Sequence, residues 1–334
     1  MNRLVNCISK FKTNDTPVWF MRQAGRYLPE FMEIRKKNTD FIKLCLNSEL
    51  AKKITVQPIE RFDLDAAIIF SDILMIPYGL GQGVKFQKGY GPILDECILD
   101  KINTTDNQFT NKLKPVYEAI EKVKKEITGK SLIGFVGAPW TLLLYMINRK
   151  SPKSNFVFNE IIKDKNLVNK LLEKLIKITC LHIKNQINAG ANVIQIFDSW
   201  AGLLPDDKLK KFCYEPNYTI VNFVKSLKVP VICFPRGIKK NYINFCSFVK
   251  PDCISIDYEV DPKWINERIN NVVIQGGMDP KILLKKEEEI EKEVKLYLDI
   301  FKNKPYIFNL GHGVLPETKP ETIKLVTNLI RDYK

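Results

Sequence analysis

The fold of this chain is most constrained by a regular alternation of short apolar runs with sequence of helical character. The runs, three to six residues long and rich in Ile, Val and Phe, have the length and composition of strands buried on both faces. Because strands and helices alternate, we expect a parallel sheet with right-handed crossovers. The runs lie at 18–20, 65–70, 132–136, 193–197, 230–234, 253–256, 272–275 and 305–308.

Eight units of this kind predict that the sheet closes into a barrel, with an open, doubly wound sheet as the alternative. At 334 residues the chain is long enough for one large barrel or two average domains. Neither a linker rich in Pro, Gly or Ser nor a repeat of fixed period divides it. We therefore predict an α/β fold, a single-domain (β/α)8 TIM barrel over residues 1–334.

The segments between the runs predict several helices and one hairpin. We expect helices over 31–37, 48–62, 111–128 and 166–189, with a kink at Pro58 in the second. The glycine-rich segment from Gly79 to Gly91 predicts a β-hairpin. It does not follow a strand and open a helix, as a dinucleotide-binding loop must. The sequence leaves open whether this hairpin acts as a lid.

The net charge and the distribution of charged residues limit the kinds of partner that the chain can bind. The net charge of +14 suits nucleic acid, a membrane surface or an acidic small molecule. The lysines are scattered along helical sequence among glutamates, which is typical of solvated faces and argues against nucleic acid. The eight cysteines form no CxxC pair, and no apolar run approaches the 18 residues of a membrane span. We expect a soluble, cytoplasmic protein with reduced cysteines, and no membrane partner.

Polar residues follow the predicted strands where an active site should form. In a (β/α)8 barrel, catalytic residues lie at the carboxyl ends of the strands. This predicts that residues far apart in the sequence share one concave face, which we call the bowl. The strand-end residues are Arg22, Asp72, Trp140, Ser199, Arg236, Asp257, Asp279 and His312.

The segment from Thr16 to Glu30, TPVWFMRQAGRYLPE, presents Arg22 and Arg26 around the small pair Ala24 and Gly25. Two guanidiniums offer planar forks of donors that suit carboxylates. The alternative is a surface helix with solvated arginines.

The chain has two histidines, which excludes a site with three histidine ligands. His182 lies inside a long helical pattern and is predicted to be a core residue. His312 lies between two glycines past the last strand, and we expect it in the site. The sequence contains neither a GxxxxGK[ST] loop nor a GxSxG motif, so Ser199 is predicted to be a hydrogen-bonding residue and not a nucleophile.

Several motifs resemble the uroporphyrinogen decarboxylase family. The two longest are PVWFMRQAGRYLP at 17–29 and GFVGAPWT at 134–141, and FSDIL, FDS and NLGHG at 70–74, 197–199 and 309–313 also match. The resemblance implies a barrel without cofactor or metal, usually a homodimer. It also implies conversion of the four acetate side chains of uroporphyrinogen III to methyl groups, which yields coproporphyrinogen III and CO2 in haem biosynthesis.

The resemblance also implies a set of site residues. Asp72 would accept hydrogen bonds from the pyrrole N–H groups and stabilise positive charge on a protonated pyrrole. Arg22 and Arg26 would bind carboxylates, and Arg22 with Asp72 would be catalytic. The positions matching the family's substrate contacts are Arg22, Gln23, Ala24, Gly25, Arg26, Asp72, Tyr145, Ser199 and His312.

The proton donor is not evident from the sequence. A guanidinium is a poor acid, so Arg22 is poorly matched to this task, whereas the ordinary pKa of histidine suits it better. Our hypothesis is that water or an arginine-bound site supplies the proton while His312 orients a carboxylate.

Two alternatives remain from the sequence. Cobalamin-dependent methyltransferases resemble this barrel but bind zinc through His and Cys, and this chain has no matching His-x-Cys pair. A nucleic-acid-binding protein would also be basic, but no recognised binding module is present.

Overall fold

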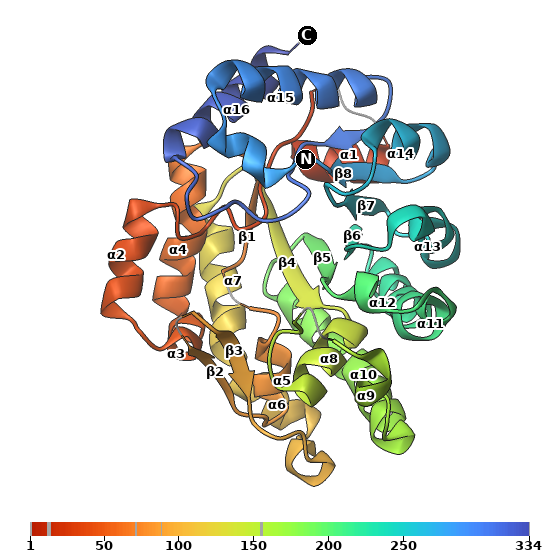
Figure 1. The fold of residues 1–334 in the computed structure, drawn as a ribbon. Helices are drawn as coiled ribbons and strands as arrows, with labels where there is room; N and C mark the ends of the chain where they lie inside the picture. Colours follow the sequence, from red (N-terminus) through yellow and green to blue (C-terminus); the bar gives the residue numbers. More distant parts are fainter. Residues whose placement is uncertain (1, 12–14, 71, 88, 154–155, 334) are drawn as a thin grey trace.

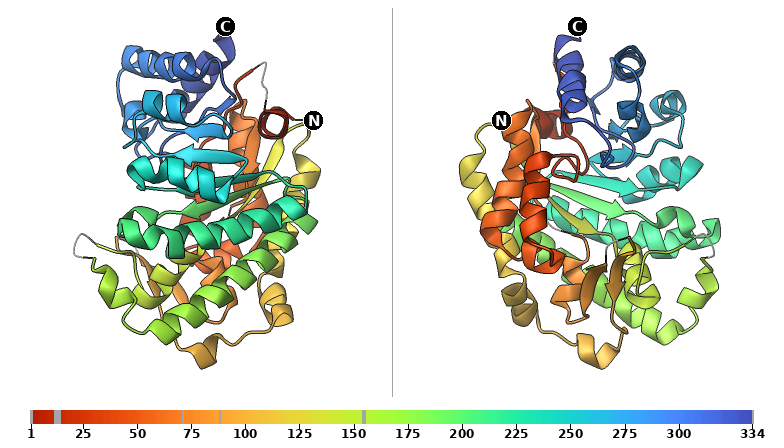
Figure 2. Two further views of the ribbon diagram at one scale, coloured as in Figure 1. Left: turned by 90° about the vertical axis from the view of Figure 1, so that its right-hand side faces the viewer. Right: turned by 60° about the vertical axis from the view of Figure 1, so that its left-hand side comes forward.

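The computed structural model describes residues 2–11, 15–70, 72–87, 89–153 and 156–333. Seven parallel strands form one curved sheet in the order β1-β4-β5-β6-β7-β8-β9, and helices cover its outer side (Figures 1 and 2). The predicted α/β barrel architecture is confirmed. The strands are β1 (Ala66–Ile68), β4 (Ser131–Gly137), β5 (Val193–Asp198), β6 (Val231–Pro235), β7 (Cys253–Ile256), β8 (Val273–Gly276) and β9 (Tyr306–Ile307).

The first predicted strand, residues 18–20, closes the barrel without forming a regular ladder. Phe308 N donates to Pro17 O at 2.8 Å, and Asp65 N donates to Val18 O at 2.9 Å. The segment therefore lies between β9 and β1. Val18 N bonds the Asp65 carboxylate at 2.7 Å, so a side chain takes the place of a backbone partner. Residues 18–20 thus supply the eighth unit of the barrel. In the described part of the chain they form one parallel bridge, between Val18 and Phe308.

The helices agree with the predicted pattern, with one exception. The expected helix over 111–128 is two helices, because Pro115 lacks an N–H group and begins a new helix more readily than it continues one. The helices are α1 (Arg3–Lys10), α2 (Pro29–Lys37), α3 (Phe41–Cys45), α4 (Ser48–Arg61), α5 (Met75–Gly79), α6 (Asp106–Lys112), α7 (Lys114–Glu126), α8 (Pro139–Asn148), α9 (Phe158–Ile161), α10 (Lys165–Asn188), α11 (Asp206–Leu209), α12 (Glu215–Ser226), α13 (Tyr242–Val249), α14 (Pro262–Arg268), α15 (Glu287–Phe301) and α16 (Pro320–Asp332).

The predicted hairpin is confirmed. It consists of β2 (Val84–Gln87) and β3 (Gly91–Leu94), which pair antiparallel. Lys88 in its turn lies outside the described residues. Leu94 N donates to Arg149 O at 2.7 Å, which fastens the base of the hairpin to the end of α8.

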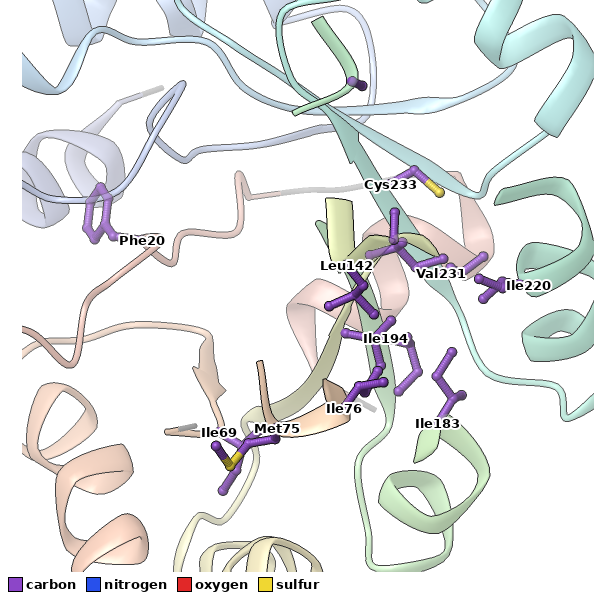
Figure 3. Close-up of a cluster of buried hydrophobic side chains, with 14 of the residues drawn as sticks. Phe20, Ile69, Met75, Ile76, Leu142, Ile183, Ile194, Ile220, Val231 and Cys233 are labelled. Carbon is purple, nitrogen blue, oxygen red and sulfur yellow. The ribbon is translucent and has the colours of Figure 1, made fainter. Parts of the chain in front are cut away.

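The core has an outer and an inner layer. Outward-facing strand residues such as Ile194 and Val231 pack on helical residues such as Leu142, Ile183 and Ile220 (Figure 3). Because side chains alternate along a strand, the next residues face inward, and these form the inner layer: Ala66, Ile133, Val193, Ile232, Phe234, Cys253, Val273 and Ile307, with Trp19 and Met21.

Helix α1 closes the amino-terminal end of the barrel. Its residues Leu4, Cys7 and Ile8 belong to the inner layer. Cys7 Sγ lies 3.8 Å from the carbonyl oxygen of Tyr306, the first residue of β9. The opposite end of the barrel is formed by the carboxyl ends of the strands and the loops that follow them.

His182 is a core residue, as predicted. It is buried, and its Nδ1 lies 2.9 Å from the hydroxyl of Tyr117. The eight cysteines are free thiols. Over the described residues, each helix is too short or too polar to span a membrane.

Candidate active site

The loop that carries Arg22 and Arg26 is fixed by the side chains of Gln23 and Asn309. Gln23 is buried; its Oε1 accepts from Phe20 N at 3.0 Å, and its Nε2 donates to Ala66 O at 2.9 Å. Asn309 Oδ1 accepts from Met21 N at 3.0 Å. The side-chain amide of Gln23 is therefore used in hydrogen bonds within the protein, and only the backbone of this residue remains for contact with a substrate.

Arg22 is held in an unusual backbone conformation. Its φ angle is +62°, in the left-handed region that residues other than Gly, Asn and Asp seldom adopt. Its side chain crosses Gly313: a Cβ atom at position 313 would lie 2.3 Å from Arg22 Cδ. A Cβ atom at Gly25 would lie 2.6 Å from Arg22 O. Glycine at both positions lets the loop fold tightly and directs Arg22 towards His312.

Arg22 lies among other charged and polar side chains. Its side chain is exposed, yet the surrounding protein lowers the pKa of its guanidinium. The charges of Arg26 and Arg236 also lower this pKa, whereas Asp72 and Tyr145 oppose the shift. The predicted site residues Arg26, Asp72 and Tyr145, with the strand-end residue Arg236, therefore lie close enough to Arg22 for their charges to act on it.

Asp72 is the carboxylate of the bowl. It is half-buried, and its Oδ1 accepts from Leu74 N at 2.9 Å. Burial raises its pKa above the ordinary value, while that hydrogen bond and the charge of Arg22 act in the opposite direction. Ser71, which precedes it in the FSDIL motif, lies outside the described residues.

His312 is half-buried beside the arginines. Burial lowers its pKa to about 3, and the positive charges of Arg22 and Arg236 contribute. The imidazole is therefore neutral near pH 7. The expectation that its pKa suits proton donation is wrong, because it took no account of the burial of the ring, to which the charges of Arg22 and Arg236 add. A neutral imidazole still offers one N–H group to a carboxylate.

We expect the imidazole NMR signal of His312 to stay constant from pH 8 down to about pH 4.5. In the unfolded chain the ordinary pKa is about 6.5, so the unfolded state binds the proton first. Protonation of His312 in the unfolded chain therefore lowers the free energy of unfolding as pH falls from about 6.5 towards 3. The H312Q variant assigns the signal. A midpoint near the ordinary histidine pKa would contradict the placement beside two cations.

Tyr145 and Ser199 lie on neighbouring units of the barrel, one on α8 and the other directly after β5. Tyr145, on α8, is half-buried; burial raises its pKa, and its ring centroid lies 6.2 Å from that of Trp200. Ser199 is half-exposed directly after β5. Ala24 and Gly25 are also half-exposed, between the two arginines.

Three strand-end residues were predicted to face the bowl, but their side chains bind neighbouring loops instead. Trp140 is buried and donates to Trp200 O at 2.9 Å. Asp257 is buried and accepts from Gly237 N at 2.7 Å and from the Tyr242 hydroxyl at 2.8 Å. Asp279 caps the helical turn that follows it by accepting from Lys281 N at 2.9 Å. These side chains hold loops in place.

The floor of the bowl is apolar, which the strand-end argument missed. Ile68 and Phe197, the last inward-facing residues of β1 and β5, pack against the inner layer, and Phe135 of β4 lies beside Phe197; all three are half-exposed. The rings of Phe135 and Phe197 lie 5.7 Å apart. Alternation along the strands could have identified them. A flat apolar ligand can rest here with its charged edge towards the arginines.

Among the described residues, no group of three His, Cys, Asp or Glu side chains is placed to bind a metal ion.

Comparison with known sequences extends over nearly the whole chain. The family model described as uroporphyrinogen decarboxylase (URO-D) matches residues 1–333. The uroporphyrinogen decarboxylase of Rickettsia bellii is 41% identical over 99% of both chains. That of Rickettsia felis is 40% identical over 100% of this chain and 98% of its own.

Comparison with solved structures supports the fold. A methyltransferase from Methanosarcina mazei is 16% identical with a TM-score of 0.79, covering 99% of this chain and 97% of its own. A B12-independent methionine synthase from Shewanella is 12% identical with a TM-score of 0.54, covering 85% and 87%. At these identities the likeness concerns the barrel alone.

Proposed function

Because this chain belongs to the uroporphyrinogen decarboxylase family and is a carboxy-lyase of haem biosynthesis, we propose that the bowl is its active site. In this proposal residues 1–334 act as one catalytic domain without cofactor or metal. The substrate is uroporphyrinogen III, a tetrapyrrole whose rim carries four acetates and four propionates. The product is coproporphyrinogen III, with four CO2 released.

The observation that carries the proposal is the presence of one carboxylate, Asp72, and of arginines that have no carboxylate partner, next to an apolar floor. Among the described residues, no carboxylate lies within 4.0 Å of the Arg22 or Arg26 guanidinium, although Arg61 is paired with Glu30 at 3.2 Å. Unpaired cations suit a ligand that brings its own carboxylates. When ionised, the Asp72 carboxylate only accepts hydrogen bonds, and the pyrrole N–H groups are donors.

Asp72 also accounts for the rate of the reaction. Protonation of a pyrrole carbon makes the ring cationic, and the ring then accepts the electron pair of the breaking C–CO2 bond. The freed methylene takes up a proton to become methyl, and the ring carbon releases its proton. A carboxylate fixed under the ring stabilises the cation before it forms, which is electrostatic preorganisation.

The remaining residues bind and orient the rim. Arg22 and Arg26 bind acetate or propionate, and the backbone of Gln23, Ala24 and Gly25 lines the approach between them. Tyr145, Ser199 and the neutral His312 donate hydrogen bonds to carboxylates. Since His312 is not an acid near pH 7, the proton comes from water or from a site beside Arg22.

We also propose a cytoplasmic homodimer, on the basis of the family resemblance. Tyr90 and Ile93 on the hairpin are exposed, at 72% and 40%, and are available for such a contact. Sedimentation of the purified chain as a monomer at micromolar concentration would reject the dimer. Recovery from a membrane fraction would reject the localisation.

The reaction is tested with purified, metal-free protein and chemically reduced uroporphyrinogen III under anaerobic conditions. Chromatography of the oxidised products should show porphyrins with seven, six, five and then four carboxyl groups. Activity in the presence of a chelator supports chemistry without a metal. A folded sample that removes no carboxyl group would reject the proposal, and zinc and corrinoid binding would then be measured.

A further inference from the structure

Arg236, at the end of β6, is a third unpaired arginine. It is half-buried, and no carboxylate of the described residues lies within 4.0 Å of its guanidinium. Arg331, by comparison, is paired with Asp63 at 3.0 Å and with Asp65 at 2.9 Å. A half-buried cation without a protein partner lacks part of its hydration and gains no ion pair in return.

The backbone around Arg236 is fixed by the segments that end the two neighbouring strands, β5 and β7. Arg236 N donates to Asp198 O at 3.1 Å, and Gly202 N donates to Arg236 O at 2.9 Å. Gly237, with φ of +81°, donates to Asp257 at 2.7 Å. A Cβ atom at Gly202 would lie 2.6 Å from Gly237 O, so the two loops touch. The backbone is thus anchored while the guanidinium itself is left free.

Arg236 follows the strand that lies across the barrel from the segment leading to Arg22. In the order of the barrel, β6 is four positions from the closing segment 18–20 in either direction. The charge of Arg236 nevertheless reaches both Arg22 and His312. Like charges that lie near one another and are partly desolvated repel each other. An anionic ligand between them would convert this repulsion into attraction.

We infer that Arg236 binds a carboxylate of the tetrapyrrole on the side of the bowl opposite Arg22 and Arg26. This inference rests on the proposed function and adds a specificity residue to it. A macrocycle with carboxylates all around its rim presents anions in opposite directions at once. A ligand with carboxylates on one edge engages Arg22 and Arg26 but leaves Arg236 unpaired.

Kinetics of R236Q and R236K with uroporphyrinogen III test the inference. We expect R236Q to raise KM about 10-fold or more, with a smaller change in kcat, because a charged hydrogen bond is lost. R236K keeps the charge but loses the planar fork, so its KM should lie between the two. R268Q, which removes an exposed arginine at the end of α14, is the matched control and should behave as wild type.

The pKa of His312 gives a second readout that does not depend on turnover. Removal of the charge at position 236 should raise this pKa in R236Q, and R268Q should leave it unchanged. A wild-type chain that leaves uroporphyrinogen intact overturns the proposed function. If the wild type is active and R236Q matches R268Q in KM, or lowers only kcat, the inference about Arg236 alone is overturned.

Discussion

Replacing Asp72 by asparagine is expected to lower kcat by about 100- to 1000-fold, the size of effect seen when one preorganised electrostatic group is removed. The asparagine oxygen can still accept from Leu74 N, which Asp72 Oδ1 now does at 2.9 Å. The local turn should therefore persist. What is lost is the negative charge under the macrocycle and the ability of both oxygens to accept pyrrole N–H donors.

Asp279→Asn is the matched control for this change. Asp279 also follows a strand and also accepts a backbone N–H two residues ahead, from Lys281 at 2.9 Å, but it does not face the bowl. Steady-state kinetics and urea unfolding should show both variants folded and only D72N impaired. Turnover near wild type in D72N would remove Asp72 from the mechanism.

Replacing Arg22 by glutamine is expected to lower kcat/KM by about 100-fold or more. The change removes one partner of the charge pair that Arg22 forms with a substrate carboxylate in the proposed complex, and such a truncation costs several kcal/mol. Glutamine keeps a long side chain at the same positive φ, so the backbone strain is unchanged. R22K retains the charge without the planar fork and should recover part of the loss.

Arg149→Gln is the control for Arg22. Arg149 is also an arginine with a left-handed backbone, with φ of +63°, but it caps the end of α8 near the hairpin. R149Q should retain wild-type kcat/KM in the same assay. If R22Q and R149Q had equal kcat/KM, Arg22 would have no part in binding the substrate.

The strands were predictable because each is buried on both faces, which demands a continuous apolar run. Rules for strand ends also placed Arg22, Asp72, Ser199, Arg236 and His312 at the same end of the barrel. These rules do not say where a side chain points, which depends on the loop that follows. Asp257 shows this, because its loop turns it towards Gly237 and Tyr242.

The ionisation of the site was less predictable than its location. The low pKa of His312 depends first on burial and then on the charges of Arg22 and Arg236, and both arise only when the barrel closes. Gln23 lies inside the most specific motif, yet its side chain supports the loop. A motif records which residues a family keeps and does not separate those that touch a ligand from those that hold the others in place.

The closing segment also has a dynamic consequence. β4 and β5 pair through a continuous register from Ile133 with Val193 to Gly137 with Phe197, whereas residues 18–20 join β9 through the bridge from Val18 to Phe308. Local opening costs least where fewest backbone hydrogen bonds must break. The loop bearing Arg22 begins at this seam. Transient opening there would detach the arginines from the rest of the bowl while the other strands stay paired, so the amide of Trp19 should exchange with solvent faster than those of β4.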